Sequence, residues 1–333
     1  MDTIKSEIIS WPIKGSFRIA RSTVTEVDVV VATVTSGQHN GRGECRPYPR
    51  YNETPEIVCA QISGLKHELS TLTRQTLADR LPNGAARNAI DCALWDLEAQ
   101  ITGKPVYELM GLAAPRTRST AFTLSIDTPG NMAEAASKVM GHTLLKIKTG
   151  NKNGLQCALA VLEARPDVTL IIDANESMTA NDLHTFQDML RAKSVALIEQ
   201  PLPAGLALPE GTANRLPVIC ADESLHTAEN LSRLWNEGYR AVNIKLDKAG
   251  GLTEAHHLAI TAKSMGFQIM LGCMVSSSLS MAPAMLLESY ADVIDLDGAL
   301  LLAKDHIGGM IYKNGNITEA SPNLWGYPRP VAN

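Results

Sequence analysis

The 333-residue sequence predicts a (β/α)8-type barrel with an α+β N-terminal capping domain, which the C-terminal tail completes. Two observations favour this fold. From residue 119 onward, short apolar segments alternate with helical stretches about every two dozen residues, as expected of βα units that form a parallel sheet. There are eight such segments, and eight parallel strands with intervening helices can close into a barrel.

Residues 1–115 are expected to form the capping domain. Residues 24–34 are rich in β-branched side chains and predict strands of a small antiparallel sheet, with a turn over residues 37–43. Residues 55–80 look helical, and a clearer helix is expected from Ala85 to Thr102, where apolar residues recur at helical spacing before Gly103. Two arginine-bearing loops are expected, at residues 17–21 and 46–51.

Residues 116–300 are expected to form the barrel. Residues 301–333 contain Asn314-Gly315, a hairpin signal within Met310–Glu319, and should return to the capping domain. The last barrel helix is poorly defined. The eight expected strands are Thr120–Ile126, Leu144–Lys148, Thr169–Asp173, Ala196–Glu199, Val218–Asp222, Val242–Leu246, Gln268–Gly272 and Val293–Asp297.

Composition excludes several classes of protein. The net charge of −5, with no basic block, argues against a nucleic-acid or anionic-membrane partner. Charged residues interrupt the first 20 positions, and no apolar run reaches the length of a membrane span, so a cytoplasmic location is expected. The six cysteines form no CxxC pair and no zinc-like spacing, which favours a reduced, disulfide-free protein.

Charged residues recur at the ends of successive expected strands. Their separations are 25, 26, 23 and 23 residues, for Lys148, Asp173, Glu199, Asp222 and Lys245 in turn. Because parallel strands in a barrel all end at one rim, these side chains should share the rim where such barrels place active sites. The eighth strand carries two further carboxylates on one face, Asp295 and Asp297.

The three successive carboxylates Asp173, Glu199 and Asp222 predict a metal site. Three uncompensated anions at one point would be costly to bury, and a hard cation resolves that cost. All-oxygen ligation favours Mg²⁺, one per subunit, with Mn²⁺ as the alternative. The opposing interpretation is that the three acids are separate turn or helix-cap residues.

The lysines predict acid–base chemistry. Lys146 and Lys148 point to one face of the second strand, and the alternative is a solvated edge strand. Strands two and six lie opposite one another in an eight-strand barrel, so Lys148 and Lys245 should face each other across the mouth. Two opposed amines suit removal of a proton from one face of a carbon and its return to the other. Lys146 is placed to lower the pKa of such a base through its own charge.

These residues resemble the enolase superfamily, and within it the muconate-lactonizing subgroup, which implies an enolase-like modified barrel. The resemblance spans nearly the whole chain. It is carried by the Lys146/Lys148 pair and by the segments Asp173-Ala174-Asn175, Glu199-Gln200-Pro201, Ala221-Asp222-Glu223-Ser224, Lys245–Gly251 and Ala89–Leu97.

Within the subgroup the chain is similar to the dipeptide epimerases, on Gly43–Tyr51, Asn243–Lys248, Leu271–Met274 and Asp295–Gly298. The resemblance implies a Mg²⁺-dependent isomerase that epimerises a small dipeptide, with L-Ala-D-Glu/L-Ala-L-Glu of murein peptide recycling as the preferred pair. It implies that Asp295 and Asp297 bind the ammonium group of the dipeptide. An arginine of a capping loop should hold the acidic side chain, Arg21 first, with Arg18, Arg46 and Arg50 as weaker candidates.

Other functions stay open. The same site could perform o-succinylbenzoate synthesis, cycloisomerisation or N-acylamino-acid racemisation, although none of those substrates has an ammonium group for the Asp295/Asp297 pair. A catalytically silent binding protein would have no use for opposed bases. Barrel enzymes of this kind are often multimers, so a homo-oligomer is an open alternative.

Overall fold

The central element of the fold is an eight-stranded parallel sheet. The computed structural model describes residues 1–19, 22–149 and 153–329, without the side chains of residues 16–19, 22 and 23. In sheet order the strands are β5 (Phe122–Leu124), β6 (Leu144–Lys148), β7 (Thr169–Asp173), β8 (Val195–Glu199), β9 (Val218–Ala221), β10 (Ala241–Ile244), β11 (Gln268–Gly272) and β12 (Val293–Asp295).

The sheet closes on itself, because the Ala121 N–H beside β5 donates to the Ile294 carbonyl of β12 at 2.9 Å. Strand order follows chain order throughout, and each neighbouring pair is parallel. Every strand therefore ends at the same rim. The predicted (β/α)8-type barrel is confirmed, with strands that end up to two residues earlier than the sequence indicates.

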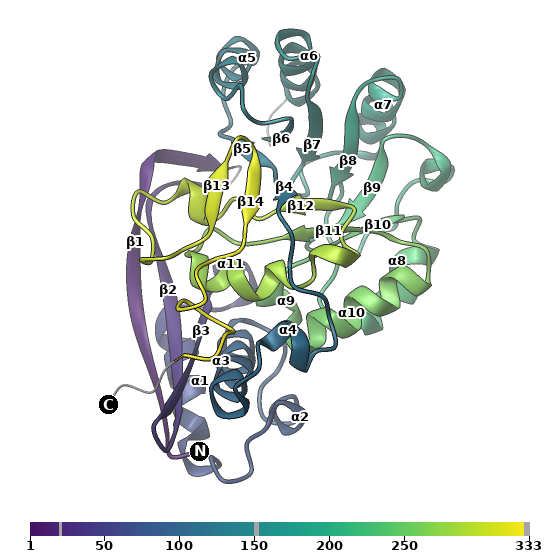
Figure 1. Ribbon diagram of the computed structural model, residues 1–333. Coiled ribbons are helices and arrows are strands. Elements are labelled where there is room, and N and C mark those ends of the chain that lie inside the picture. The colour runs from purple at the N-terminus through teal and green to yellow at the C-terminus, as the bar shows by residue number, and fades with distance from the viewer. Residues whose placement is uncertain (20–21, 150–152, 330–333) are drawn as a thin grey trace.

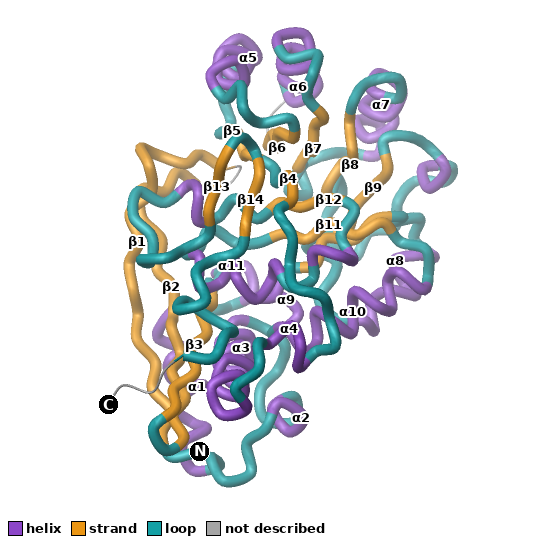
Figure 2. Tube along the Cα trace, in the orientation of Figure 1, coloured by secondary structure: helices purple, strands orange, loops and turns teal. Residues whose placement is uncertain are grey.

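Helices cover the outside of the barrel, and Figures 1 and 2 show α5, α6 and α7 as an outer row beyond the strands. Local sequence sets their starts: the hydroxyl of Thr128 caps α5, and Thr179 and Asp182 form a capping box on α7. The β8–β9 connection carries a 3-10 helix, Thr212–Asn214, where the repeat predicts an α-helix. The helices of the barrel are α5 (Pro129–Lys138), α6 (Gly154–Ala164), α7 (Ala180–Leu190), α8 (Leu231–Asn236), α9 (Leu246–Ala249), α10 (Leu252–Ser264) and α11 (Ser278–Met285).

The N-terminal region forms an antiparallel sheet of three strands, β1 (Thr3–Ile19), β2 (Ser22–Ser36) and β3 (His39–Cys45). The long β1–β2 ribbon runs along one side of the molecule in Figure 1. The predicted turn over residues 37–43 is too long, since β3 begins at His39, and the expected loop from Phe17 is strand through Ile19. Helices α1 (Pro55–Gly64), α2 (Arg74–Leu77), α3 (Ala85–Thr102) and α4 (Val106–Leu109) follow.

Helix α3 has the predicted bounds, and it lies closely against β3. A Cβ atom at Gly41 would be 2.1 Å from the Ala93 carbonyl oxygen, and one at Gly43 would be 2.2 Å from the Ala89 carbonyl oxygen. The glycines of β3 are thus required by backbone contact with α3, which explains why a buried strand carries residues that otherwise weaken strands.

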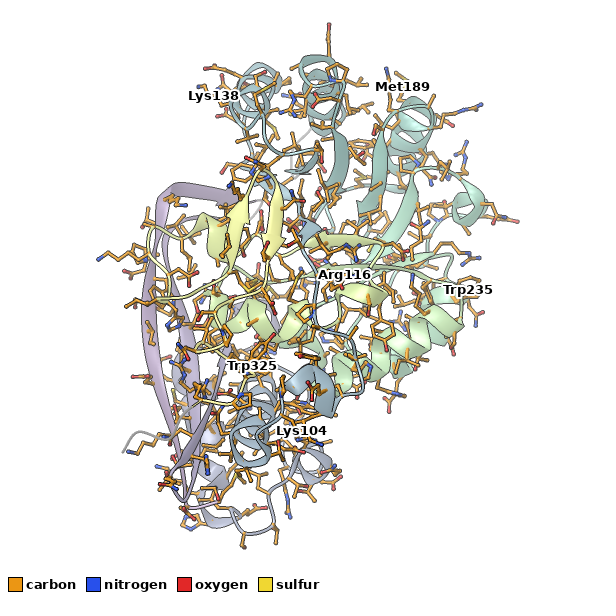
Figure 3. All side chains as sticks on the ribbon, viewed as in Figure 1. Lys104, Arg116, Lys138, Met189, Trp235 and Trp325 are labelled. Carbon is orange, nitrogen blue, oxygen red and sulfur yellow. The ribbon has the colours of Figure 1, made fainter. Side chains whose placement is uncertain are left out.

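The C-terminal segment contains the predicted hairpin, β13 (Ile311–Lys313) and β14 (Asn316–Thr318) around Asn314-Gly315. The hairpin pairs with β4 (Arg118–Ser119), directly before the barrel. The chain then reaches α3, where the Trp325 indole donates to the Cys92 carbonyl and Arg329 pairs with Asp96 at 2.8 Å. Figure 3 labels Trp325 at this position.

Candidate active site

A cavity of about 790 Å³ lies at the carboxyl ends of the barrel strands, and capping-domain residues form part of its wall. Charged side chains from five barrel segments line it, namely Lys146, Lys148, Asp173, Asp222, Glu223, Lys245, Asp295 and Asp297. The capping domain contributes Val24, Val27, Arg46, Tyr48, Pro49, Arg50 and Tyr51. Large, partly apolar cavities with convergent polar groups are the usual form of a small-molecule site.

Lys148 and Lys245 lie on opposite walls of this cavity. Lys148 ends β6 and Lys245 follows β10, four strands away in an eight-strand barrel. The Lys148 ammonium donates to Asp173 Oδ2 at 2.7 Å, and Lys245 donates to Asp222 Oδ2 at 2.7 Å. Each amine is therefore held by a different carboxylate, which fixes its position relative to the cavity.

Lys146 lies between the carboxylates. Its ammonium is 2.7 Å from Glu199 Oε2, 2.8 Å from Asp295 Oδ2 and 3.2 Å from Asp173 Oδ2. Burial alone would lower the pKa of Lys146, but these three carboxylates outweigh it and raise the pKa well above its usual range. Lys146 is thus a fixed positive charge shared by three strands.

The three predicted metal ligands lie at the ends of adjacent strands. Each has an oxygen 2.7 Å from a lysine ammonium, Asp173 from Lys148, Glu199 from Lys146 and Asp222 from Lys245. Asp222 Oδ1 accepts from Lys248 at 2.6 Å, and Glu199 Oε1 accepts from the Asn243 amide at 2.6 Å. Within the described ranges, no three acid, histidine or cysteine side chains are grouped as they would be around a metal ion. The carboxylates share one rim, where Lys146 contacts both Asp173 and Glu199, and Lys245 contacts both Glu199 and Asp222.

The donor set nevertheless fits a hard cation. On the barrel side of the cavity, the described residues include six carboxylates and four lysine ammonium groups, Lys248 included, which leaves this side with an excess of two negative charges when all are ionised. Arg46 and Arg50 lie on the capping-domain side. Burial and then the charge of Asp173 raise the pKa of Glu199 to about 8, as expected where negative charge is under-compensated. The charge and oxygen chemistry of Asp173, Glu199 and Asp222 suit one divalent cation.

Asp295 and Asp297 form a second anionic part of the cavity, at the end of β12. Asp297 Oδ2 accepts the Thr123 backbone N–H at 2.7 Å, and Asp295 is the partner of Lys146. Burial and then Asp295 raise the pKa of Asp297 to about 6. Oxygen Oδ1 of Asp295 is buried with no hydrogen-bond partner among the described residues, so it can accept a donor from a ligand.

Several residues that the motifs contain, but to which we assign no role from sequence, turn out to organise the site. The Asn175 carboxamide oxygen accepts from Lys148 at 3.0 Å, and Lys248 donates to Asp222. Gln200 is fully buried and its Oε1 accepts the backbone N–H groups of Asp222 and Ser224. Each of these residues lies one to three positions after a predicted site residue, and that proximity is the only sequence feature that could have identified it. Their hydrogen-bond partners lie on neighbouring strands, which the spacing does not predict.

The arginine candidates separate clearly. Arg21 lies outside the described residues, as does the side chain of Arg18, so the Arg21 prediction stays a prediction. Arg50 forms an ion pair with Glu176, with Nη2 2.5 Å from Oε1. Arg46 lines the cavity and donates from Nη1 to the Asp28 carbonyl.

Family models match both parts of the chain. Residues 3–111 match the mandelate racemase/muconate lactonizing enzyme N-terminal domain, and residues 131–317 match the enolase C-terminal domain-like family. The chain therefore belongs to the mandelate racemase/muconate lactonizing enzyme family of the enolase superfamily.

Individual relatives are similar over almost the whole chain. The L-Ala-D/L-Glu epimerase of Escherichia coli is 44% identical over 321 residues, which are 95% of this chain and 99% of the relative. The N-acetyl-D-glutamate racemase of a Pseudoalteromonas species is 43% identical over 303 residues, 90% of this chain and 95% of the relative. Since the relatives are epimerases and racemases of this family, the chain is an isomerase of that class.

Solved structures of similar proteins agree. An enolase family member from Agrobacterium tumefaciens, homologous to dipeptide epimerases and bound to sodium and L-Ala-L-Glu, superposes with a TM-score of 0.92 at 42% identity, over 97% of this chain and 99% of that one. A dipeptide epimerase from Methylococcus capsulatus, complexed with Mg and L-Arg-D-Lys, gives 0.84 at 29% identity, over 96% and 97%. Along the described part of the chain, no helix has the length and apolar character to cross a membrane.

Proposed function

We propose that the protein is a Mg²⁺-dependent dipeptide epimerase that inverts the α-carbon of the C-terminal residue. The preferred pair is L-Ala-D-Glu and L-Ala-L-Glu, and the setting is cytoplasmic murein peptide metabolism. The observation that carries the proposal is the placement of Lys148 and Lys245 on opposite walls of one cavity. Two amines on either side of one carbon are what a 1,1-proton transfer requires.

The reaction proceeds by exchange of roles between the two lysines. The lysine that faces the Cα–H bond acts as a neutral amine and removes the proton. The opposite lysine, as an ammonium, then donates a proton to the other face, and the configuration is inverted. With the other epimer bound, Lys148 and Lys245 exchange roles. Asn175 and the carboxylate of Asp173 hold Lys148 in place, and Asp222 holds Lys245.

The remaining parts of the dipeptide would meet the carboxylates of the cavity. Asp173, Glu199 and Asp222 would hold one Mg²⁺ (or Mn²⁺), which when bound supplies positive charge against the negative charge that develops on the substrate carboxylate. The ammonium group of the N-terminal residue would lie at Asp295 and Asp297, where Oδ1 of Asp295 lacks a partner among the described residues. Lys146 links the two regions, since it contacts Glu199 and Asp295.

The comparisons support this assignment. A relative 44% identical over 95% of the chain is an L-Ala-D/L-Glu epimerase, and a structural neighbour 42% identical binds L-Ala-L-Glu. The test is incubation with L-Ala-L-Glu and Mg²⁺ in D₂O, with NMR observation of the glutamate α-proton. Loss of that signal together with appearance of L-Ala-D-Glu is expected. Absence of exchange with any dipeptide would sink the proposal.

A second candidate is racemisation of N-acylglutamate. Two observations favour it: the similarity to N-acetyl-D-glutamate racemase at 43% identity, and the ion pair of Asp295 with Lys146 at 2.8 Å, which already neutralises one carboxylate of the pair. The candidates differ in the ammonium group. N-propionyl-L-glutamate has the shape of L-Ala-L-Glu without that group, so the ratio of kcat/KM for the two compounds distinguishes them. A ratio above about 100 in favour of the dipeptide identifies a dipeptide epimerase.

A further inference from the structure

Lys248 is a buried cation that lies outside the cavity. It belongs to the short helix α9, and its side chain is only 1% exposed. The described residues that line the cavity include Lys245 but not Lys248, so Lys248 is not placed to meet a bound substrate directly. An ammonium group in such a place is costly unless protein acceptors replace its water. The acceptors of Lys248 therefore indicate its role.

Those acceptors belong to two residues at neighbouring strand ends. The Lys248 ammonium donates to Asp222 Oδ1 at 2.6 Å, to the Asp222 carbonyl at 2.5 Å and to the Asn243 carbonyl at 3.2 Å. An ammonium group has three N–H donors, so all of them are used. Because one lysine binds both the carboxylate and the main chain of Asp222, rotation of that carboxylate would break a charge-assisted hydrogen bond.

The two carboxylate oxygens of Asp222 are thereby distinguished. Oδ1 accepts from Lys248, whereas Oδ2 accepts from Lys245, which lines the cavity. Gln200 fixes the main chain as well, since its Oε1 accepts the Asp222 N–H at 2.9 Å. Asp222 is thus held in one orientation, with Oδ2 as the oxygen next to a cavity-lining residue.

Lys248 also reaches Glu199, a second predicted metal ligand, through Asn243. The Asn243 carbonyl accepts from Lys248, and the Asn243 carboxamide donates to Glu199 Oε1 at 2.6 Å. Asn243 and Glu199 are both fully buried, so water does not compete for this contact. One buried lysine therefore connects two of the three acids that suit a divalent cation.

We propose that Lys248 is a positioning residue that orients Asp222, and through Asn243 also Glu199, for binding of the divalent cation. This inference rests on the proposed function. The charge of Lys248 by itself acts in the opposite direction, because a positive charge close to the site weakens the binding of another cation. The positioning role and the charge therefore predict opposite changes in metal affinity when the lysine is replaced.

The test measures the binding of Mn²⁺ alone, without substrate, from the EPR signal of the free ion. We expect Lys248→Met to raise the Kd for Mn²⁺ by about 10- to 100-fold, the usual effect of removing a residue that orients a metal ligand. Lys248→Gln should recover part of the affinity, because an amide can still donate to Asp222. Lys104→Met removes an exposed lysine of the capping domain, and as the matched control it should leave the Kd unchanged.

A Kd that is unchanged or lower in Lys248→Met would overturn the inference. A lysine that only stabilises the fold would lower the melting temperature and leave the Kd of the folded protein unchanged, so both quantities are measured. Lys245 still pairs with Asp222 in this variant. If Lys248→Met nevertheless did not fold, the Kd of Lys248→Gln would decide by the same criterion. Absence of Mn²⁺ binding in the wild type would instead reject the metal dependence of the proposed function, and this inference with it.

Discussion

Each lysine of the cavity is distinguished by its carboxylate partners. Lys148 is held by Asp173 and Lys245 by Asp222, whereas Lys146 contacts three carboxylates at once. Because Lys146 contacts three carboxylates, it is suited to holding those carboxylates in place. Lys148 and Lys245 each bind one carboxylate closely. We therefore propose that these two lysines transfer protons and that Lys146 supplies structural charge.

Replacing one of the opposed lysines should separate exchange from epimerisation. Because each lysine serves one face of the carbon, Lys245→Ala should slow epimerisation by about 100- to 10,000-fold and still allow α-proton exchange of one epimer through Lys148. Lys148→Ala is the mirror control and should retain exchange of the opposite epimer only. NMR in D₂O with each pure epimer measures both. If both variants exchanged the same epimer, the two-base arrangement would be wrong.

The positions of the lysines and acids at the rim can be predicted from the sequence, because a charged residue recurs at the same place in successive βα units. Their partners do not follow. Asn175, Gln200 and Lys248 are close in sequence to functional residues, yet their hydrogen bonds cross from one strand end to the next. Which lysine meets which acid depends on lengths and angles of neighbouring side chains, and no sequence spacing encodes those.

Strand β3 shows where element prediction fails. Its glycines indicate a turn when the sequence is considered alone, since glycine weakens strands. The structure explains them by the contact of Gly41 and Gly43 with the α3 backbone, a relation between elements about fifty residues apart. In contrast, α3 itself is predictable to the residue because its apolar spacing and its Gly103 C-cap are both local signals.

A methyl group at Gly43 should push β3 away from α3. The added Cβ would meet the Ala89 carbonyl oxygen at 2.2 Å and the Ala93 nitrogen at 2.8 Å, and backbone atoms cannot rotate aside. We expect Gly43→Ala to reduce stability by at least about 2 kcal/mol. Gly64→Ala is the control, because Gly64 is an exposed residue of α1 where an added Cβ would have nothing within 4 Å, and alanine there should be neutral or slightly stabilising. Thermal denaturation of both variants measures the difference. Equal melting temperatures would show that Gly43 is not in close contact with the α3 backbone.

At the scale of the whole molecule, buried polar contacts join the capping domain to the barrel rim. Glu44 of β3 accepts the backbone N–H of Ser277 at 2.7 Å and its hydroxyl at 2.5 Å, at the start of α11. Asp247, two residues beyond Lys245, accepts from the Arg46 N–H and from the Asn88 amide of α3. The strand end that carries Arg46 is therefore hydrogen-bonded to the segment that carries Lys245, which joins the two walls of the cavity.

The Asp247 contact makes stability depend on pH. Burial raises the pKa of Asp247 to about 7, despite the hydrogen bonds from Arg46 and Asn88. Between the ordinary value near 3.9 and 7, the folded state keeps a proton that the unfolded state has released, so this group's contribution to stability falls as pH rises through that window. An asparagine side chain at this position would stay neutral, and its carboxamide oxygen could accept the same two hydrogen bonds. Asp247→Asn should therefore stabilise the protein more at pH 8 than at pH 5, by a difference of about 2 kcal/mol in unfolding free energy. Denaturant unfolding at the two pH values measures it, with the exposed Asp79→Asn as control. A gain that is the same at both pH values would show that Asp247 is not the titrating group at this interface.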